Sequence, residues 1–233
     1  MKQIFYKYRD IIVVVLSLAF SLILGIIAKD IILSLLCTFT ALMGFYFAAR
    51  GNKINYLFEI VNYVAMAYFA FKNHLFGTFS MYVFICIPLN IAGFITWKNN
   101  TKEDDVVAMR KFNLKTSAIV VSLCLVSSVL LGYILSLIPT QQMSFLDASS
   151  NCINIAGVIL FNLRYIETWY VWLVNNILDM VIWTIVLVNG GPGSIIMFVT
   201  ALVYLLLNFY GIINWFITIK KENKKKEVIT DWW

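Results

Sequence analysis

Histidine, proline and charged residues are scarce in this sequence, which holds one histidine, three prolines and only 13% charged residues. A soluble domain carries about 25% charged residues, so this chain has too few to cover its 61% hydrophobic content with a water-facing surface. The four cysteines lie at 37, 86, 124 and 152 inside apolar segments, and no two have metal-ligand spacing. With His74 as the lone histidine, the sequence predicts no metal site and no cofactor.

Catalytic motifs are missing as well. The sequence has no cluster of His, Cys, Asp and Glu, no nucleophile elbow and no Gly-rich phosphate loop. Gly-Gly-Pro-Gly at 190–193 is typical of a tight turn between two helices. We therefore predict that the protein is not an enzyme and does not use ATP directly.

Long hydrophobic segments dominate the chain instead. A helix of roughly 18 or more apolar residues crosses the ~30 Å of hydrocarbon in a bilayer. We predict an all-α integral membrane protein with eight transmembrane helices, at 11–28, 31–49, 54–71, 77–97, 116–137, 145–163, 166–188 and 195–219. The first segment is followed by Lys29 and Asp30 without a small-residue cleavage motif, so it is not expected to be a signal peptide.

The basic residues indicate the orientation of these helices. Eight spans place both termini on one side, and with that side in the cytoplasm sixteen of the eighteen Lys and Arg residues lie inside. Only Lys29 and Lys72 lie outside. This bias predicts a multi-pass protein of the cell membrane with both termini cytoplasmic. The loop 98–115 and the basic tail 220–233 are then cytoplasmic, and we expect the tail to lie near anionic lipid rather than bind nucleic acid.

An internal repeat divides the chain into two similar parts. LNIAGFITW at 89–97 recurs as LNFYGIINW at 207–215, NYLFEIVNY at 55–63 is matched by TWYVWLVNN at 168–176, and Gly44 is matched by Gly157. The repeats are three helices each, 31–97 and 145–219, with a linker helix at 116–137 and an extra N-terminal helix within 1–30. One linking helix makes the repeats parallel. Repeats in a membrane usually enclose a substrate path, so the pattern predicts a transporter.

The segment RYIETWYVWLVNN at 164–176 contains the string R-x-x-E-x-W-x-x-W-x-x-x-N. This string resembles the signature of the PnuC nicotinamide riboside transporters, and the resemblance covers about 31–221. It implies a three-plus-one-plus-three helix fold related to the SWEET sugar transporters, facilitated diffusion of a vitamin, and a homotrimer. Substrate accumulation would then require trapping by cytoplasmic phosphorylation. The extra first helix departs from the usual seven-helix core.

Polar side chains inside the spans are the candidates for a site, because they are costly in lipid and usually face the protein interior. Trp169, Trp172 and Asn176 share one helical face, and indole rings suit a flat cationic ring. Asp179 extends this face, and Pro88 predicts a kink beside Asn90. The candidate substrate-binding residues are Trp172, Asn176, Asn62, Asn90, Asn208, Trp169, Glu59 and Tyr210.

Several of these candidates have structural alternatives. The asparagines could instead join helices, at about 0.6 kcal/mol for such a pair, and Trp169 could lie in an aromatic belt at the interface. Glu59 is either a counter-ion for a cationic substrate or a protonated structural side chain. For the function, the alternatives are another vitamin, such as thiamine or riboflavin, and a membrane scaffold without transport.

Overall fold

The computed structural model describes residues 2–100, 110–111 and 114–230, with side chains described at 10–100, 110–111 and 117–220. Most of the predicted loop 98–115 and the last three residues of the predicted tail lie outside the described residues. The helices follow the order α1 (Lys2–Ile27), α2 (Ile31–Ser34), η1 (Leu35–Phe39), α3 (Thr40–Ala49), α4 (Asn55–Lys72), α5 (Phe76–Met81), η2 (Tyr82–Cys86), α6 (Ile87–Lys98), α7 (Leu114–Ser136), α8 (Ser144–Asn162), α9 (Thr168–Val188) and α10 (Ser194–Thr230), with η for π-helical segments.

Each predicted span coincides with one helix or with a run of consecutive helices. Seven of these are long and apolar enough to cross a membrane, so the chain is an all-α membrane protein with seven candidate spans in its described part. The remaining predicted span, 54–71, corresponds to α4, which is less apolar because it carries Asn55, Glu59, Asn62 and Lys72. A helix satisfies its own backbone hydrogen bonds, which is what the lipid interior requires of a spanning segment.

Two π-helical segments interrupt the first and third helices of the first repeat, where the sequence indicated continuous helices. η2 ends directly before the turn that contains Pro88, and proline has no N–H to continue the regular bonding pattern. The carbonyl of Cys37 in η1 accepts a hydrogen bond from Asn62 Nδ2 at 2.7 Å, and that of Cys86 in η2 accepts one from Asn90 Nδ2 at 2.8 Å. Such π-helical turns are frequent at functional sites.

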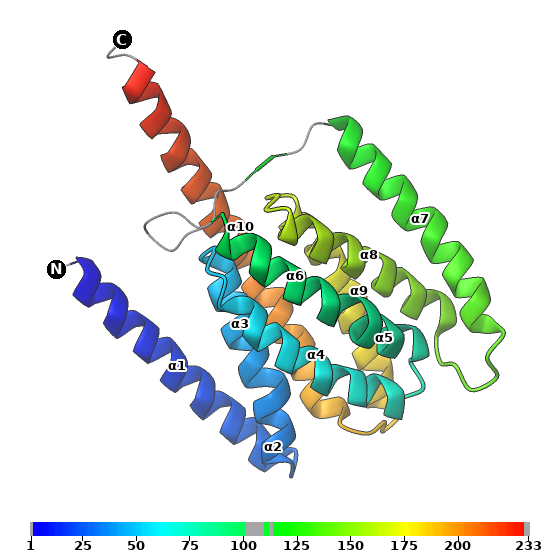
Figure 1. Ribbon diagram of the computed structural model, residues 1–233. Coiled ribbons are helices and arrows are strands. Elements are labelled where there is room, and N and C mark those ends of the chain that lie inside the picture. Colours follow the sequence, from blue (N-terminus) through cyan, green and yellow to red (C-terminus); the bar gives the residue numbers. More distant parts are fainter. Residues whose placement is uncertain (1, 101–109, 112–113, 231–233) are drawn as a thin grey trace.

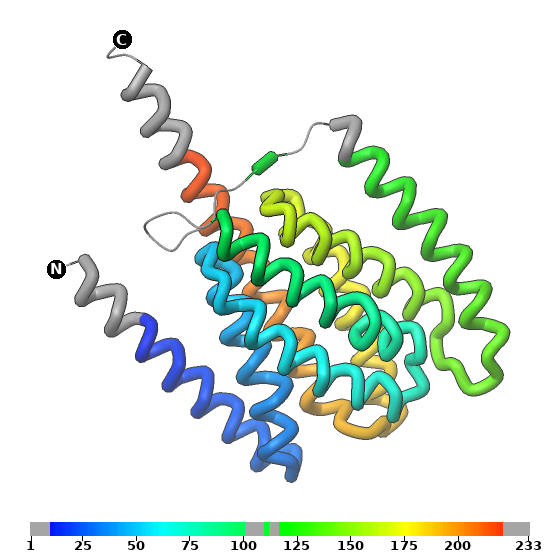
Figure 2. Tube along the Cα trace, viewed as in Figure 1, coloured from blue at the N-terminus to red at the C-terminus, as the bar shows by residue number. Residues whose placement is uncertain are grey.

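The helices form a central bundle with one helix against each edge (Figure 1). The two repeats meet where α3 packs on α10 and where α5 and α6 pack on α8. α1 lies against α2 and η1 at one edge, and α7 lies along α8 at the opposite edge (Figure 2). Only 17% of the α7 span is buried within the protein, so most of this helix faces outward.

Two tryptophans join the repeats reciprocally. Trp97, which ends the first repeat, donates its Nε1–H to the carbonyl of Phe161 at 3.2 Å, and Trp215 donates to the carbonyl of Ala48 at 3.0 Å. Ala48 and Phe161 occupy equivalent positions, as Trp97 and Trp215 do. Both indoles are fully buried, so each repeat closes on the backbone of the other at the same end of the bundle.

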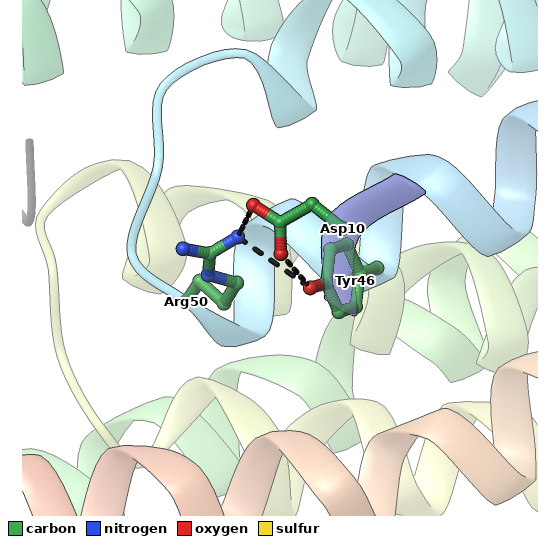
Figure 3. Close-up of polar contacts among 3 residues, drawn as sticks. All are labelled: Asp10, Tyr46 and Arg50. Carbon is green, nitrogen blue, oxygen red and sulfur yellow. Dashed lines mark hydrogen bonds and ion pairs between the residues drawn. The ribbon is translucent and has the colours of Figure 1, made fainter. Parts of the chain in front are cut away.

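The extra helix α1 is joined to α3 by a polar cluster (Figure 3). Arg50 Nη1 lies 2.6 Å from Asp10 Oδ2, and the Tyr46 hydroxyl donates to Asp10 Oδ1 at 2.5 Å. The Arg50 and Asp10 side chains are partly exposed, so the ion pair contributes only about 0.2–1 kcal/mol. Its main effect is to fix which end of α1 lies beside the loop after α3.

Candidate functional site

A narrow cavity lies between the two repeats, and we refer to it as the central cavity. Helices of both repeats contribute its side chains, which are Phe45, Ala48, Asn55, Glu59, Tyr63, Tyr82, Asn90, Asn154, Val158, Phe161, Trp172, Asn175, Asn176, Asp179 and Tyr204. The cavity has a volume of about 40 Å³. The lining combines rings, amides and two carboxyl groups, and it includes no Lys, Arg or His among the described residues.

Aromatic rings form one wall of the central cavity. The ring of Trp172 lies 4.9 Å from that of Phe161 and 5.6 Å from that of Phe45, measured between centroids. Tyr204 continues the wall at 4.5 Å from Phe45. Gly157 on α8 lies directly beneath the Trp172 indole, where an added Cβ would collide with Nε1. This wall presents indole and phenyl surfaces that can stack on a flat ring.

Glu59 of the first repeat also lines the cavity. Its carboxyl group lies directly over Gly44 of α3, where an added Cβ would collide with Oε1. Tyr63 and Tyr82 stack beside it, with centroids 5.1 Å apart. The side chain is 7% exposed, so this carboxyl group has left bulk water and depends on its neighbours for hydrogen bonds.

The second carboxyl group of the cavity belongs to Asp179 on α9. It accepts a hydrogen bond from Ser150 Oγ at 2.5 Å and another from Asn175 Nδ2 at 2.9 Å. Asn176 Nδ2 donates to the carbonyl of Tyr204 at 3.3 Å. Both oxygens of Asp179 therefore have donors, whereas Asn176 is held by a long hydrogen bond that a ligand could replace.

The structure brings four of the eight predicted site residues to the central cavity: Glu59, Asn90, Trp172 and Asn176. Asn62 lies behind this lining, where it accepts a hydrogen bond from the Tyr204 hydroxyl at 2.6 Å. Asn62 therefore contacts a residue of the lining, and its contact with substrate stays a prediction.

The other three predicted residues lie elsewhere. Trp169 is fully buried in the core, 5.7 Å from Trp215 between ring centroids and packed against Gly211. Asn208 is fully buried, and neither of its amide atoms has a hydrogen-bond partner among the described residues. Tyr210 is 36% exposed and stacks on Tyr46 at the surface of the bundle.

Several lining residues were not among the sequence candidates. Asp179 was expected only to extend the face of Asn176, and it lines the cavity. Tyr63 follows Asn62 directly, so the spacing of the polar residues could have indicated it. Tyr204 gave no such signal, because the equivalent position of the first repeat is Cys86. Phe45 and Phe161 sit in uniformly apolar segments, where no pattern separates a cavity wall from a helix contact.

Comparisons with known proteins agree on one family. The family profile described as nicotinamide mononucleotide transporter matches residues 31–217. The nicotinamide riboside transporter PnuC of Neisseria mucosa is 26% identical over 193 residues, which cover 79% of this chain and 72% of that protein. The nicotinamide riboside transporter PnuC of Haemophilus influenzae is 25% identical over 178 residues, 75% of each chain.

A solved structure has the same fold. The crystal structure of the vitamin B3 transporter PnuC superimposes with a TM-score of 0.78 at 23% identity, and the match covers 91% of this chain and 92% of that one. Coverage of this extent includes nearly all of the helices described above.

Proposed function

The chain belongs to the nicotinamide mononucleotide transporter family, and from this membership and the central cavity we propose that it carries nicotinamide riboside across the cell membrane by facilitated diffusion. The protein is a membrane transporter and not an enzyme. Two relatives are named as nicotinamide riboside transporters. The observation that carries the choice of substrate is the lining of the cavity, which combines aromatic rings with a buried carboxyl group.

The chemistry of nicotinamide riboside matches this lining. Its pyridinium ring carries a fixed positive charge, which an indole face attracts by about 0.5–2 kcal/mol. Trp172 supplies that face, and Glu59 supplies a carboxyl group. Asn90 and Asn176 supply amides for the carboxamide and ribose hydroxyl groups. A neutral sugar would need no acid in such a site, and an anionic ligand would be repelled by both acids.

The cavity has to widen during transport. Its volume of about 40 Å³ is much less than a ring with a ribose requires. We propose that the repeats move relative to each other and open the cavity to one side at a time, as repeat-built carriers do. Because the carrier itself supplies no energy, accumulation would require phosphorylation of the substrate in the cytoplasm.

For the topology, we propose eight spans, which are the seven candidate spans and α4. We also propose two parallel repeats of three helices at 31–97 and 145–219. Contacts between loops support this arrangement. At one end of the bundle Asn214 reaches the carbonyl of Ala49 and Arg164 binds Asn100, and at the other Asn73 bonds to the carbonyl of Pro192. The first end carries most of the described basic residues, so we place it, with both termini, in the cytoplasm.

For the assembly, we propose a homotrimer, on the strength of the resemblance to the family. The outward faces of α1 and α7 are apolar and wide enough to contact either lipid or other subunits. The partners of the chain would then be its vitamin substrate, the bilayer and two further copies.

The test of the substrate is a binding and uptake experiment. Purified protein in detergent should bind nicotinamide riboside in a calorimeter, and the same protein in liposomes should equilibrate the labelled compound without ATP or an ion gradient. Thiamine and riboflavin serve as competitors, because both are vitamins with flat ring systems. Preferential binding of either would assign the cavity to that vitamin, and absence of uptake for all three would favour a scaffold.

A further inference from the structure

A second, wider cleft lies at the end of the bundle that we place outside the cell, and we refer to it as the outer cleft. Its walls are the turn between α1 and α2, the end of α4 and the loop between α9 and α10 (Figure 1). Its volume is about 560 Å³. The extra helix and both repeats therefore contribute to this cleft.

The charged residues of this end are gathered in the outer cleft. The segments that form the end of the bundle are 28–31, 71–77, 136–144 and 188–195. Their Lys, Arg, Asp and Glu residues are Lys29, Asp30 and Lys72, and all of these line the cleft. Membrane proteins carry few lysines on the outer side. The two lysines that do occur there thus converge on one place from two different helix ends.

Neither lysine is neutralised within the protein. In the described part of the chain, neither ammonium group forms an ion pair or a hydrogen bond. Lys72 lies over the ring of Tyr68, with its nitrogen 5.7 Å from the ring centroid. Asp30 Oδ1 accepts a hydrogen bond from the backbone N–H of Leu33 at 3.0 Å, so this carboxylate caps α2 and does not pair with Lys29. The cleft therefore holds an excess of positive charge.

The start of α10 adds hydrogen-bond donors to the cleft. Ser194 is the first residue of this helix, lines the cleft and is only 8% exposed. Its hydroxyl group has no hydrogen-bond partner among the described residues. A buried hydroxyl without a partner is costly, which indicates that a bound group completes its hydrogen bonding. The backbone N–H groups of the first turn of this long helix favour an anion as that group.

Apolar side chains beside these groups indicate that the anion belongs to a lipid. Leu33, Tyr68 and Ile195 line the cleft within about one helical turn of the charged residues. Tyr68 is 52% exposed and Ile195 is 44% exposed. Because the spans end here, the lysines lie at the level of the lipid headgroups, where tyrosine is also common. The acyl chains of a phospholipid would cover these apolar surfaces, and a soluble anion would not.

We propose that the outer cleft binds the phosphate group of an anionic phospholipid in the outer leaflet, such as phosphatidylglycerol. Lys29 and Lys72 pair with the phosphate oxygens, and Ser194 donates a hydrogen bond to them. Asp30 accepts a hydrogen bond from the glycerol headgroup. This inference goes beyond the proposed function, because it concerns neither the central cavity nor its substrate.

Such a lipid would contact both repeats at once. Lys72 belongs to the first repeat and Ser194 to the second, and between them Asn73 Nδ2 donates to the carbonyl of Pro192 at 3.1 Å. A ligand that contacts both sides of a junction stabilises the form in which the two sides are close. Bound lipid should therefore raise the melting temperature of the protein.

Thermal unfolding of the full-length protein in a neutral detergent tests the proposal. The melting temperature is measured without lipid, with phosphatidylglycerol and with phosphatidylcholine of the same chain length. We expect phosphatidylglycerol to raise it by about 2–4 °C or more, and phosphatidylcholine to raise it much less. Soluble glycerol phosphate carries the same anionic group without acyl chains, and it should cause no shift.

The double variant Lys29→Gln/Lys72→Gln removes both positive charges from the cleft and nearly preserves side-chain length. Its shift with phosphatidylglycerol, taken from its own lipid-free melting temperature, should be smaller by about half or more. Lys53→Gln/Lys98→Gln is the matched control, because these lysines lie at the other end of the bundle, where anionic lipid binds through general attraction. The control should keep most of the shift.

Three results would overturn the inference and leave the proposed function standing. Equal shifts with phosphatidylglycerol and phosphatidylcholine, or no shift with either, would show that the cleft does not select an anionic lipid. An equal shift with glycerol phosphate would assign the cleft to a soluble anion. Equal losses in the two double variants would show that the lipid acts through the overall charge of the protein.

Ser194→Ala separates the cleft from the lysines themselves. It removes one hydroxyl group without changing the charge, so it should reduce the shift with phosphatidylglycerol while leaving the lipid-free melting temperature nearly unchanged. Ser149→Ala is its control, since Ser149 is on α8 outside the cleft and donates to the carbonyl of Phe145 at 2.7 Å. A full shift in Ser194→Ala would contradict the placement of the phosphate at the start of α10.

Discussion

Glu59 and Trp172 occupy equivalent positions in the two repeats, and each lies over an equivalent glycine. The Glu59 carboxyl group covers Gly44, and the Trp172 indole covers Gly157, so that an added Cβ at either glycine would collide with the side chain above it. One repeat thus offers an acid where the other offers an indole. Symmetric helices have here produced an asymmetric cavity, which suits a substrate with a charged ring and no twofold symmetry of its own.

Replacing the indole tests the aromatic wall. Trp172→Ala should weaken nicotinamide riboside binding by about 1–3 kcal/mol, the range measured when bases lose an aromatic stacking partner. Calorimetry on the purified variant gives the value. Tyr170→Ala is the matched control, because Tyr170 is on the same helix but 49% exposed on its outer face. Unchanged affinity in a well-folded Trp172→Ala protein would remove this ring from the site.

The glycine beneath the indole offers a second, smaller perturbation. Gly157→Ala should push Trp172 into the cavity and reduce affinity about tenfold or more, with a stability cost of about 1–3 kcal/mol for overpacking. Gly132→Ala is the control, since its Cβ would press on Phe145, between α7 and α8 and away from the cavity. That variant should lose stability alone. A similar loss of affinity in both variants would indicate a general disturbance of the bundle rather than an effect of Trp172.

The helices of this fold were predictable because membrane-spanning segments must be long and apolar. The sequence repeat also identified Trp97 and Trp215 as equivalent residues. In the structure each of them donates a hydrogen bond to a backbone carbonyl in the other repeat. The two π-helical segments were not predictable, because η1 contains neither glycine nor proline. Sequence gives little indication of such turns when their side chains suit a regular helix equally well.

The site was predictable only in part, for a reason that Trp169 illustrates. Trp169 and Trp172 are three residues apart on a helix that is surrounded by others, so both indoles are buried. In such a helix, apolar periodicity cannot tell the face that lines a cavity from the face that packs against a neighbour. Gly211 determines that Trp169 packs against a neighbouring helix, because its missing side chain leaves room for the indole against α10. Only the packing of α9 on α10 reveals that contact.

The orientation in the membrane is tested by reporters. A reporter that functions only in the cytoplasm should be active when it is fused after residue 233, because sixteen basic residues are assigned to the cytoplasmic side. A second fusion in the loop at 190–193 should give the opposite result, since this loop lies at the other end of the bundle beside Asn73. The same location for both fusions would contradict the proposal of eight spans.

The equivalent asparagines Asn90 and Asn208 should differ in their roles. Asn90 lines the central cavity, and its Nδ2 is held by the carbonyl of Cys86 at 2.8 Å. Asn208 is fully buried with both amide atoms unpartnered among the described residues. A buried amide without partners costs about 1–3 kcal/mol of desolvation that nothing returns. We therefore expect Asn90→Leu to lose affinity for nicotinamide riboside, and Asn208→Leu to keep both affinity and thermal stability.

Two measurements on each variant separate these roles, the melting temperature and the dissociation constant. A lower melting temperature for Asn208→Leu would show that its amide makes a stabilising bond, and full affinity in Asn90→Leu would remove that amide from the site. With stability and affinity retained, uptake of nicotinamide riboside in liposomes is the remaining measurement for Asn208→Leu. Loss of uptake alone would show that the Asn208 amide finds a partner in a conformation that the carrier adopts after the substrate has bound.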